Sequence, residues 1–201
     1  MRRVGLTTLL MIFALGSTAM ADSACHANAI GKDGKPLAGA RSSGLKHQSY
    51  DLNPGAEFTV ESLQPNKPRV LQFVHDSKKL AGVFVLHGDE TGPISVRLEP
   101  WGALTGRLVS PRGEPLAGLE VSCRLEAMRN GKSLNTTALF VQSDKDGRFR
   151  IEGLAASLTY RDFTVSKNHY VWDVAGGGPK NLTLKAGETK DLGDLEVKPM
   201  E

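Results

Sequence analysis

Apolar and polar residues alternate with a period of two along most of this chain. In residues 94–99, isoleucine, valine and leucine alternate with serine, arginine and glutamate, and residues 119–126 and 148–154 follow the same rule. Such alternation places the apolar side chains on one face of a β-strand. No segment shows a sustained apolar period of 3.6 residues with helix caps. We therefore expect an all-β protein built from half-buried strands.

Glycine-rich or proline-bearing turn signals separate the expected strands at short intervals. Glycine reaches positive φ without steric cost, and proline and aspartate favour tight turns. Many short strands with regular turns predict an antiparallel β-sandwich. The turn signals are Asp33-Gly34, Asn53-Pro54-Gly55, Gly88-Asp89, Pro111-Arg112-Gly113, Asp146-Gly147 and Gly176-Gly177-Gly178-Pro179.

Two parts of the chain repeat each other. Residues 33–40 (DGKPLAGA) match residues 112–119 (RGEPLAGL) at an offset of 79, and residues 57–63 (EFTVESL) match residues 148–154 (RFRIEGL) at an offset of 91. The second copy is therefore longer between its landmarks, and we place the extra residues within 127–138. The repeat predicts two tandem β-sandwich units. Their bounds are residues 28–100 and residues 101–199, with a loose segment at 22–27 before them and Trp101 packed at the joint.

Residues 1–21 have the features of a secretory signal peptide. Arg2 and Arg3 form a basic start, residues 4–16 are an apolar run too short to span a bilayer comfortably, and residues 19–21 read Ala-Met-Ala. Signal peptidase accepts this small-x-small pattern, so we expect cleavage after Ala21. An uncleaved N-terminal anchor is the alternative. The mature chain is expected to be secreted or periplasmic, at the cell envelope, without a membrane span after cleavage.

Lipidation at Cys25 is not expected, because Asp22 stands where the bacterial lipidation motif requires an apolar residue. Cys25 and Cys123 would share an oxidising compartment, where one disulfide is chemically allowed. Cys123 falls on the apolar side of the alternation in residues 119–126. A buried free thiol that packs as a small apolar group is therefore the alternative to the disulfide.

The charge balance argues against a nucleic-acid partner. The chain has 25 lysines and arginines against 22 aspartates and glutamates, a net charge of +3. Removing Arg2 and Arg3 with the signal peptide leaves 23 basic and 22 acidic residues, a net charge of +1. These charges are interspersed, whereas nucleic-acid binding requires a concentrated basic face.

Both copies of the repeat resemble the carboxypeptidase regulatory-like domain, a transthyretin-like sandwich of seven strands. In the second copy, residues 113–118 (GEPLAG) match its G-x-P-L-x-G turn, and residues 143–154 (SDKDGRFRIEGL) match its T-D-x-x-G-x-F and apolar-G-L elements. Ser143 replaces the usual threonine. The first copy departs further, with residues 54–58 (PGAEF) in place of the aspartate turn. The resemblance implies a fold and no activity, because such modules are attached to peptidases, transporters and surface proteins and usually carry no catalysis.

Motifs for metal binding or catalysis are weak in this sequence. Asp144 and Asp146 could offer oxygens to calcium, but the further acids that an EF-hand loop requires do not follow at the right spacing, so a plain turn is expected. The histidines form no His-x-His or His-Glu-x-x-His pair, and no Gly-x-Ser-x-Gly elbow occurs. We expect no metal, no cofactor and no catalytic residue, and hence no enzyme.

Tyr170, Trp172 and Val174 share one face of a predicted strand. Exposed aromatic rings on a sheet can stack on sugar rings, which is the functional interpretation. Packing inside the protein is the alternative, and it is favoured because His169 and Asp173 make the opposite face more polar. The near-continuous apolar runs at residues 70–74 and 83–86 predict strands buried on both faces, or a surface shared between the two units.

Together these features favour a non-catalytic recognition or scaffolding module, exported to the cell envelope, that binds a glycan or a protein. An accessory or regulatory subunit of an exported enzyme or transporter is one alternative. A hydrolase with an unrecognised site is another. The expected partner is an envelope protein or polysaccharide, and the sequence names no ligand-binding residues.

Overall fold

The structure is a computed structural model that describes residues 23–46, 50–52, 55–65, 67–134 and 136–200. The predicted signal peptide lies outside these residues. Their regular structure is all β, apart from two short 3-10 turns, η1 (Asp76–Lys78) and η2 (Ala175–Gly177). Among the described residues, no helix has the length and apolar character needed to cross a membrane. The all-β prediction is confirmed.

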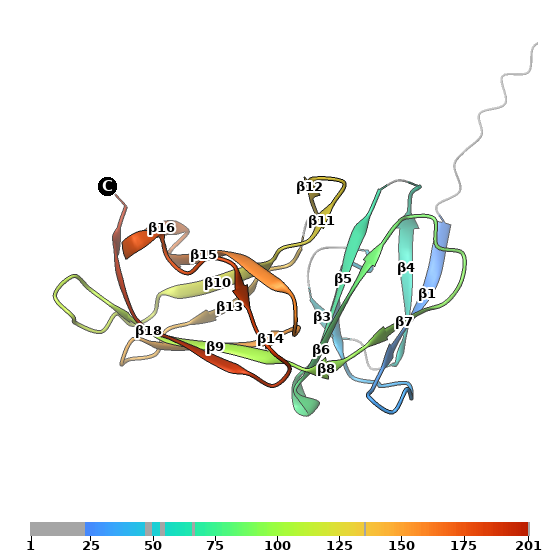
Figure 1. Cartoon of the computed structure of the whole chain (residues 1–201), viewed down its shortest axis with the longest axis horizontal. Helices are drawn as coiled ribbons and strands as arrows, with labels where there is room; N and C mark the ends of the chain where they lie inside the picture. Colours follow the sequence, from blue (N-terminus) through green and yellow to red (C-terminus); the bar gives the residue numbers. More distant parts are fainter. Residues whose placement is uncertain (1–22, 47–49, 53–54, 66, 135, 201) are drawn as a thin grey trace, which may run out of the picture.

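The first unit is a sandwich of two sheets (Figure 1). One sheet has the strand order β4-β1-β7, and the other has the order β3-β2-β5-β6-β8. Between them lies a core that includes Leu71 and Leu86, with the rings of Phe58 and Phe73 packed edge to face at 4.9 Å. The strands are β1 (Ser23–Ile30), β2 (Arg41–Ser43), β3 (Asp51–Leu52), β4 (Glu57–Leu63), β5 (Arg69–His75), β6 (Leu80–Leu86), β7 (Ile94–Arg97) and β8 (Glu99–Pro100).

The second unit is built from one sheet with the strand order β13-β10-β15-β16-β18-β9-β14. The edge strands β13 and β14 approach each other, so the sheet folds into a sandwich around Leu104, Val121 and Ile151. The strands are β9 (Gly102–Val109), β10 (Glu120–Leu125), β13 (Leu139–Gln142), β14 (Arg148–Leu154), β15 (Thr159–Lys167), β16 (Tyr170–Val174), β17 (Leu182–Thr183), which pairs with β15, and β18 (Thr189–Pro199); a separate hairpin joins β11 (Met128–Arg129) and β12 (Lys132–Ser133).

The internal repeat of the sequence is visible strand by strand. β1 pairs with β4 and, in parallel, with β7, just as β9 pairs with β14 and, in parallel, with β18. The isolated bridge between Ile30 and Pro36 recurs between Val109 and Pro115, at the sequence offset of 79. The two parallel pairs correct the expectation of purely antiparallel sheets. Parallel pairing is possible here because the rest of each unit forms the long connection that it needs.

Residues 23–27 belong to β1, so the prediction of a loose segment at residues 22–27 is wrong for this part of the chain. β1 lies between β4 and β7, and its Cys25, Ala27 and Ala29 are buried. Small apolar residues at every second position give a weak hydrophobic signal, although they suit a central strand packed closely against the opposite sheet.

Cys25 and Cys123 are free, and they lie in the cores of different units. The alternative of buried thiols is therefore confirmed, and the alternative of a disulfide is wrong in this structure. Burial raises the pKa of the Cys123 thiol to about 12 and also raises the pKa of Cys25. Because the thiolate is the reactive form, both side chains act here as small apolar groups.

β5 is buried on both faces because it belongs to two interfaces. Leu71 and Phe73 face the core of the first unit, whereas Val70 joins the core of the second unit. Val74 packs with Trp101 in a small cluster at the joint, which also includes Ala81 and Ala155. Both interpretations of the apolar run at residues 70–74 are thus correct. The structure also confirms the packing role predicted for Trp101.

Candidate functional site

The side chain of Gln72 in the first unit hydrogen-bonds to the backbone of Thr137 in the second unit. Its Oε1 accepts a hydrogen bond from the Thr137 N–H at 2.7 Å, and its Nε2 donates to the Thr137 carbonyl at 3.3 Å and to the Tyr50 hydroxyl at 3.0 Å. The hydroxyls of Ser43 and Thr137 are also hydrogen-bonded. Gln72 is only 4% exposed, so these bonds replace those its amide would make with water. The chain that leads into β13 is therefore held against the first unit.

Beside this contact the units leave a groove of about 720 Å³. Trp101, Leu139 and Ile151 line it and are buried, so its floor is apolar. Phe140 of β13 also lines the groove, yet its side chain is 70% exposed. An aromatic ring left in water beside an apolar floor is a typical feature of an interaction site. We refer to this feature as the junction groove.

Each wall of the junction groove carries an ion pair. On the first unit, the Arg41 guanidinium binds both carboxylate oxygens of Asp76, at 2.7 and 2.9 Å, and lies over the Tyr50 ring at 5.3 Å. On the second unit, Arg150 of β14 pairs with Glu152 at 2.7 Å. The hydrogen bond from Arg41 lowers the pKa of Asp76. Burial raises the pKa of the Tyr50 hydroxyl. The charges of the two walls are balanced, so the groove has no net charge.

Leu52 is the cross-strand neighbour of Arg41, which belongs to the wall formed by the first unit. It lies directly opposite Arg41 in the antiparallel pair of β2 and β3, and directly opposed residues point to the same side of a sheet. Leu52 therefore lies on the face that carries Arg41, and its side chain is 73% exposed. Exposed apolar side chains are thus found on both units, next to the same groove.

Replacing Asp76 by asparagine should reduce stability at neutral pH and have no effect in strong acid. The pKa of Asp76 is lower in the folded state than in the unfolded state, where it is about 4. The ionised carboxylate therefore stabilises the fold at pH values above the unfolded-state pKa. This contribution is lost as the pH falls through the folded-state pKa. Because the Asp76 side chain is 57% exposed, we expect a loss of at most about 1 kcal/mol at pH 7. Urea unfolding at pH 7 and pH 2.5 measures this loss in the free energy of unfolding, and Asp173→Asn is the exposed control. A deficit of equal size at both pH values would contradict the assignment.

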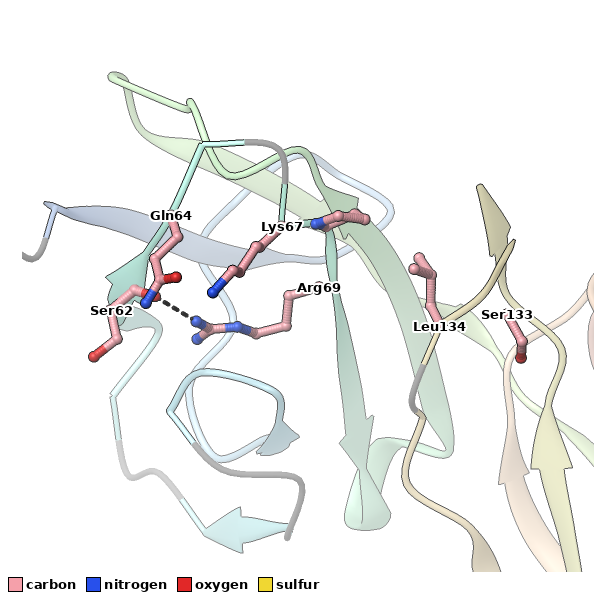
Figure 2. A pocket seen from close by; sticks show the side chains of 7 residues that line it. Ser62, Gln64, Lys67, Arg69, Ser133 and Leu134 are labelled. Carbon is pink, nitrogen blue, oxygen red and sulfur yellow. Dashed lines mark hydrogen bonds between the residues drawn. The ribbon is translucent and has the colours of Figure 1, made fainter. Parts of the chain in front are cut away.

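A second and more polar hollow, of about 420 Å³, lies between the first unit and the β11–β12 hairpin (Figure 2). Arg69 is its central group, with Lys67 and Gln64 nearby and Ser133 and Leu134 on the far side. The Arg69 guanidinium donates to four backbone carbonyls, those of Gly44, Leu45, Glu61 and Ser62, at 2.7–3.3 Å. Arg69 therefore ties segments of the first unit together, and the hollow is a weaker candidate than the junction groove.

The three residues of the face predicted on β16 differ in their burial. Val174 is buried and Trp172 is half-buried against the core of the second unit, as the packing alternative requires. Tyr170 is 77% exposed at the start of the strand. Only one ring of the predicted pair is therefore open to solvent.

Asp144 and Asp146 form a turn, which the Asp144 carboxylate closes. Its Oδ1 accepts hydrogen bonds from the backbone N–H of Asp146 at 2.9 Å and of Arg148 at 2.8 Å. Gly147, with φ of +74°, donates its N–H to the Asp144 carbonyl at 2.9 Å. In the described part of the chain, no three histidine, cysteine, aspartate or glutamate residues cluster as a metal site. The Asp144 carboxylate suggested for calcium thus has a structural role in the turn.

The junction groove was not predicted from the sequence. Its walls come from β2, η1, β13 and β14, which are far apart in the chain. One signal was available: residues 139–142 (LFVQ) form a short strand without a charge, and the apolar Phe140 breaks the alternation of period two. An apolar residue out of phase on a half-buried strand predicts an exposed apolar side chain, which is a signal for a contact surface.

Comparisons with known proteins show distant similarity only. No protein-family model and no curated protein matches this chain. The Bacillus anthracis TIE protein aligns at 15% identity over 89% of this chain and 34% of its own, with a TM-score of 0.35. A streptococcal ancillary pilin aligns at 16% identity over 86% of this chain and 63% of its own, with a TM-score of 0.29. The shaft pilin SpaA of Lactobacillus rhamnosus GG aligns at 13% identity over 90% of this chain and 98% of its own, with a TM-score of 0.31.

This chain spans about a third of the TIE protein and less than two thirds of the ancillary pilin. The similarity to these three proteins is distant. At these TM-scores it carries no information on activity or partner.

Proposed function

We propose that this chain is a non-catalytic binding module, exported to the cell envelope, that binds a protein partner in the junction groove. The observation that carries the proposal is the groove itself, with an apolar floor at Trp101, balanced ion pairs on its walls, and exposed Phe140 and Leu52 beside it. Protein interfaces combine such an apolar, aromatic centre with a polar rim. The signal-peptide pattern of residues 1–21 supports export.

The chemistry of the groove favours a polypeptide over a glycan. Leu52 offers no ring face for a sugar, and both arginines are occupied by their own carboxylates. An apolar side chain of a partner could be buried between Phe140 and the floor without leaving a charge unpaired. The edge strand β13 adds backbone groups that a polypeptide can complement and a sugar cannot repeat at the same spacing.

Replacing Phe140 by serine should strongly weaken capture of the partner. The measurement is a pull-down from solubilised envelope with the chain lacking residues 1–21, read for proteins and for glycans. We expect one protein at constant stoichiometry with the wild type, and binding weakened about 30-fold by the variant, because truncating a central aromatic anchor costs about 2 kcal/mol or more. The matched control is Tyr170→Ser, a similarly exposed ring on β16, a strand that contributes no residue to the lining of the groove.

Other observations would overturn this proposal or specify the partner. A protein retained equally by both variants would place the binding surface elsewhere. Glycan lost only with Tyr170→Ser would favour polysaccharide binding at β16. If the captured protein is an exported enzyme or transporter, the chain is its accessory or regulatory subunit. Turnover of a substrate that disappears with a single polar substitution would instead favour a hydrolase.

We also propose that both units, with their boundary at residues 100 and 101, belong to the carboxypeptidase regulatory-like family. The repeated bridges Ile30–Pro36 and Val109–Pro115 support this, because they give the G-x-P-L-x-G turn the same partner in each unit. The turn also meets the aspartate turn, since the Leu116 N–H bonds to the Leu108 carbonyl next to Gly147. An alignment of homologues in which Pro115 and Gly147 vary freely would contradict the assignment.

A further inference from the structure

We infer that the partner's bound segment is an extended strand that hydrogen-bonds to the free edge of β13. This inference rests on the proposed function and specifies how the groove is used. In the described part of the chain, β13 is at the end of its sheet and its ladder partner is β10. Its other side carries backbone groups that pair with no further strand of the sheet. Such an edge is a template for an added strand.

The hydrogen bonds next to β13 show which backbone groups face its free edge. Ser143 follows the strand, donates its N–H to the Leu119 carbonyl at 2.8 Å, and accepts from the Gly118 N–H at 2.9 Å. Both polar groups of Ser143 therefore point toward the β10 side. Because the backbone direction alternates with each residue, those of Gln142 and Phe140 point away from β10.

β13 also lacks the charges that protect the other edges. Among the edge strands of four or more described residues, β4 carries Glu57 and Glu61, β7 carries Arg97, and β14 carries arginines and a glutamate. β13, Leu139–Gln142, has neither a charge nor a proline. Charged side chains and prolines prevent edge strands from pairing with other chains. Their absence leaves β13 open to an added strand.

The contact between Gln72 and Thr137 shows that this segment already pairs with an amide outside its own sheet. The Gln72 side-chain amide bonds both the N–H and the carbonyl of Thr137, two residues before β13 begins. Thr137 lies outside β13, so the contact shows that the backbone just before this strand can bind an amide group of another element.

The walls of the junction groove specify the residues of the added strand. One face of the strand would lie toward the apolar floor at Trp101 and Leu139, so every second side chain should be apolar. The ion pairs Arg41–Asp76 and Arg150–Glu152 are internally balanced, so no particular charge is required. The segment is therefore expected to alternate apolar and polar residues.

The first test uses a phage-displayed library of random twelve-residue peptides against the immobilised chain without residues 1–21. We expect enriched peptides with apolar residues at every second position, and loss of their binding to Phe140→Ser. Enrichment of peptides with a helical period, or no enrichment, would overturn the inference. Neither result would affect the pull-down of a folded partner, which tests the proposed function separately.

The second test compares Gln142→Pro with Gln142→Ala, using the enriched peptide as the probe. Proline removes an N–H that faces away from β10, so the sheet keeps its ladder while the added strand loses a donor. We expect peptide binding about 10-fold weaker for the proline variant and nearly unchanged for the alanine variant. Equal binding by both variants would overturn strand addition while leaving the Phe140 result intact.

Backbone amide exchange of the wild-type chain covers the case in which Gln142→Pro does not fold. Peptide binding should slow the exchange of the Phe140 and Gln142 amides, because their N–H groups become donors to the added strand. Unchanged exchange at both amides would overturn the inference, since a peptide held by its side chains alone leaves them in water.

Discussion

Replacing Trp101 by alanine should lower the free energy of unfolding by about 3–5 kcal/mol, the usual cost of removing a buried large aromatic side chain. Trp101 is only 7% exposed and packs with Val74 and Ala81 of the first unit and Ala155 of the second. Its removal leaves a cavity where the units meet and takes away the floor of the junction groove. Urea unfolding followed by circular dichroism measures the change.

Trp172→Ala is the matched control, because the chain has two tryptophans and Trp172 is only half-buried. We expect a smaller loss there, of about 1–2 kcal/mol, since less apolar area is removed from contact. The wild type should unfold in one transition, because Val70 of the first unit belongs to the core of the second. Equal losses for the two variants would contradict a structural role of Trp101 at the joint.

Replacing Gly147 by alanine should cost about 3 kcal/mol or more. Its φ is +74°, which alone costs an alanine about 1–2 kcal/mol. A Cβ at this position would also lie 2.5 Å from the Leu108 carbonyl oxygen and 3.0 Å from the Leu116 nitrogen. Both neighbours are backbone atoms, Leu108 in β9 and Leu116 in the G-x-P-L-x-G turn, so relief of the clash requires the aspartate turn to move away from both. Chemical denaturation of the purified variant measures the loss.

Gly113→Ala separates the two contributions. Gly113 has a similar φ of +80°, but a Cβ there would meet nothing within 4 Å. We expect this variant to lose only the conformational cost, about 1–2 kcal/mol. If Gly113→Ala is as damaging as Gly147→Ala, the contact between the two turns does not contribute to stability.

Much of the fold could be predicted because it is encoded locally. The alternation in residues 119–126 predicted β10, and the aspartate turn before Gly147 predicted the start of β14. The offsets of the sequence repeat are those that relate β1 to β9 and β4 to β14. Small residues were the main source of error, since Cys25, Ala27 and Ala29 gave too weak a signal to place β1.

The candidate site could not be predicted in the same way. Phe140 and Arg150 lie on different edge strands, and Arg41 belongs to the other unit. Pairing of Arg41 with Asp76 joins residues 35 positions apart, and the bonds between Gln72 and Thr137 join residues 65 apart. No local pattern contains such contacts, because they depend on how completed sheets pack.

The sequence by itself determined the all-β class, the turns, the repeat and the expected export signal, since each depends on neighbouring residues or on self-similarity along the chain. Only the tertiary structure decided that β1 is a central strand, that β5 is shared by two interfaces, and that β13 keeps a free edge beside a groove. The physical reason is that burial of a strand edge or face depends on the surfaces that pack against it. Those surfaces come from distant parts of the chain.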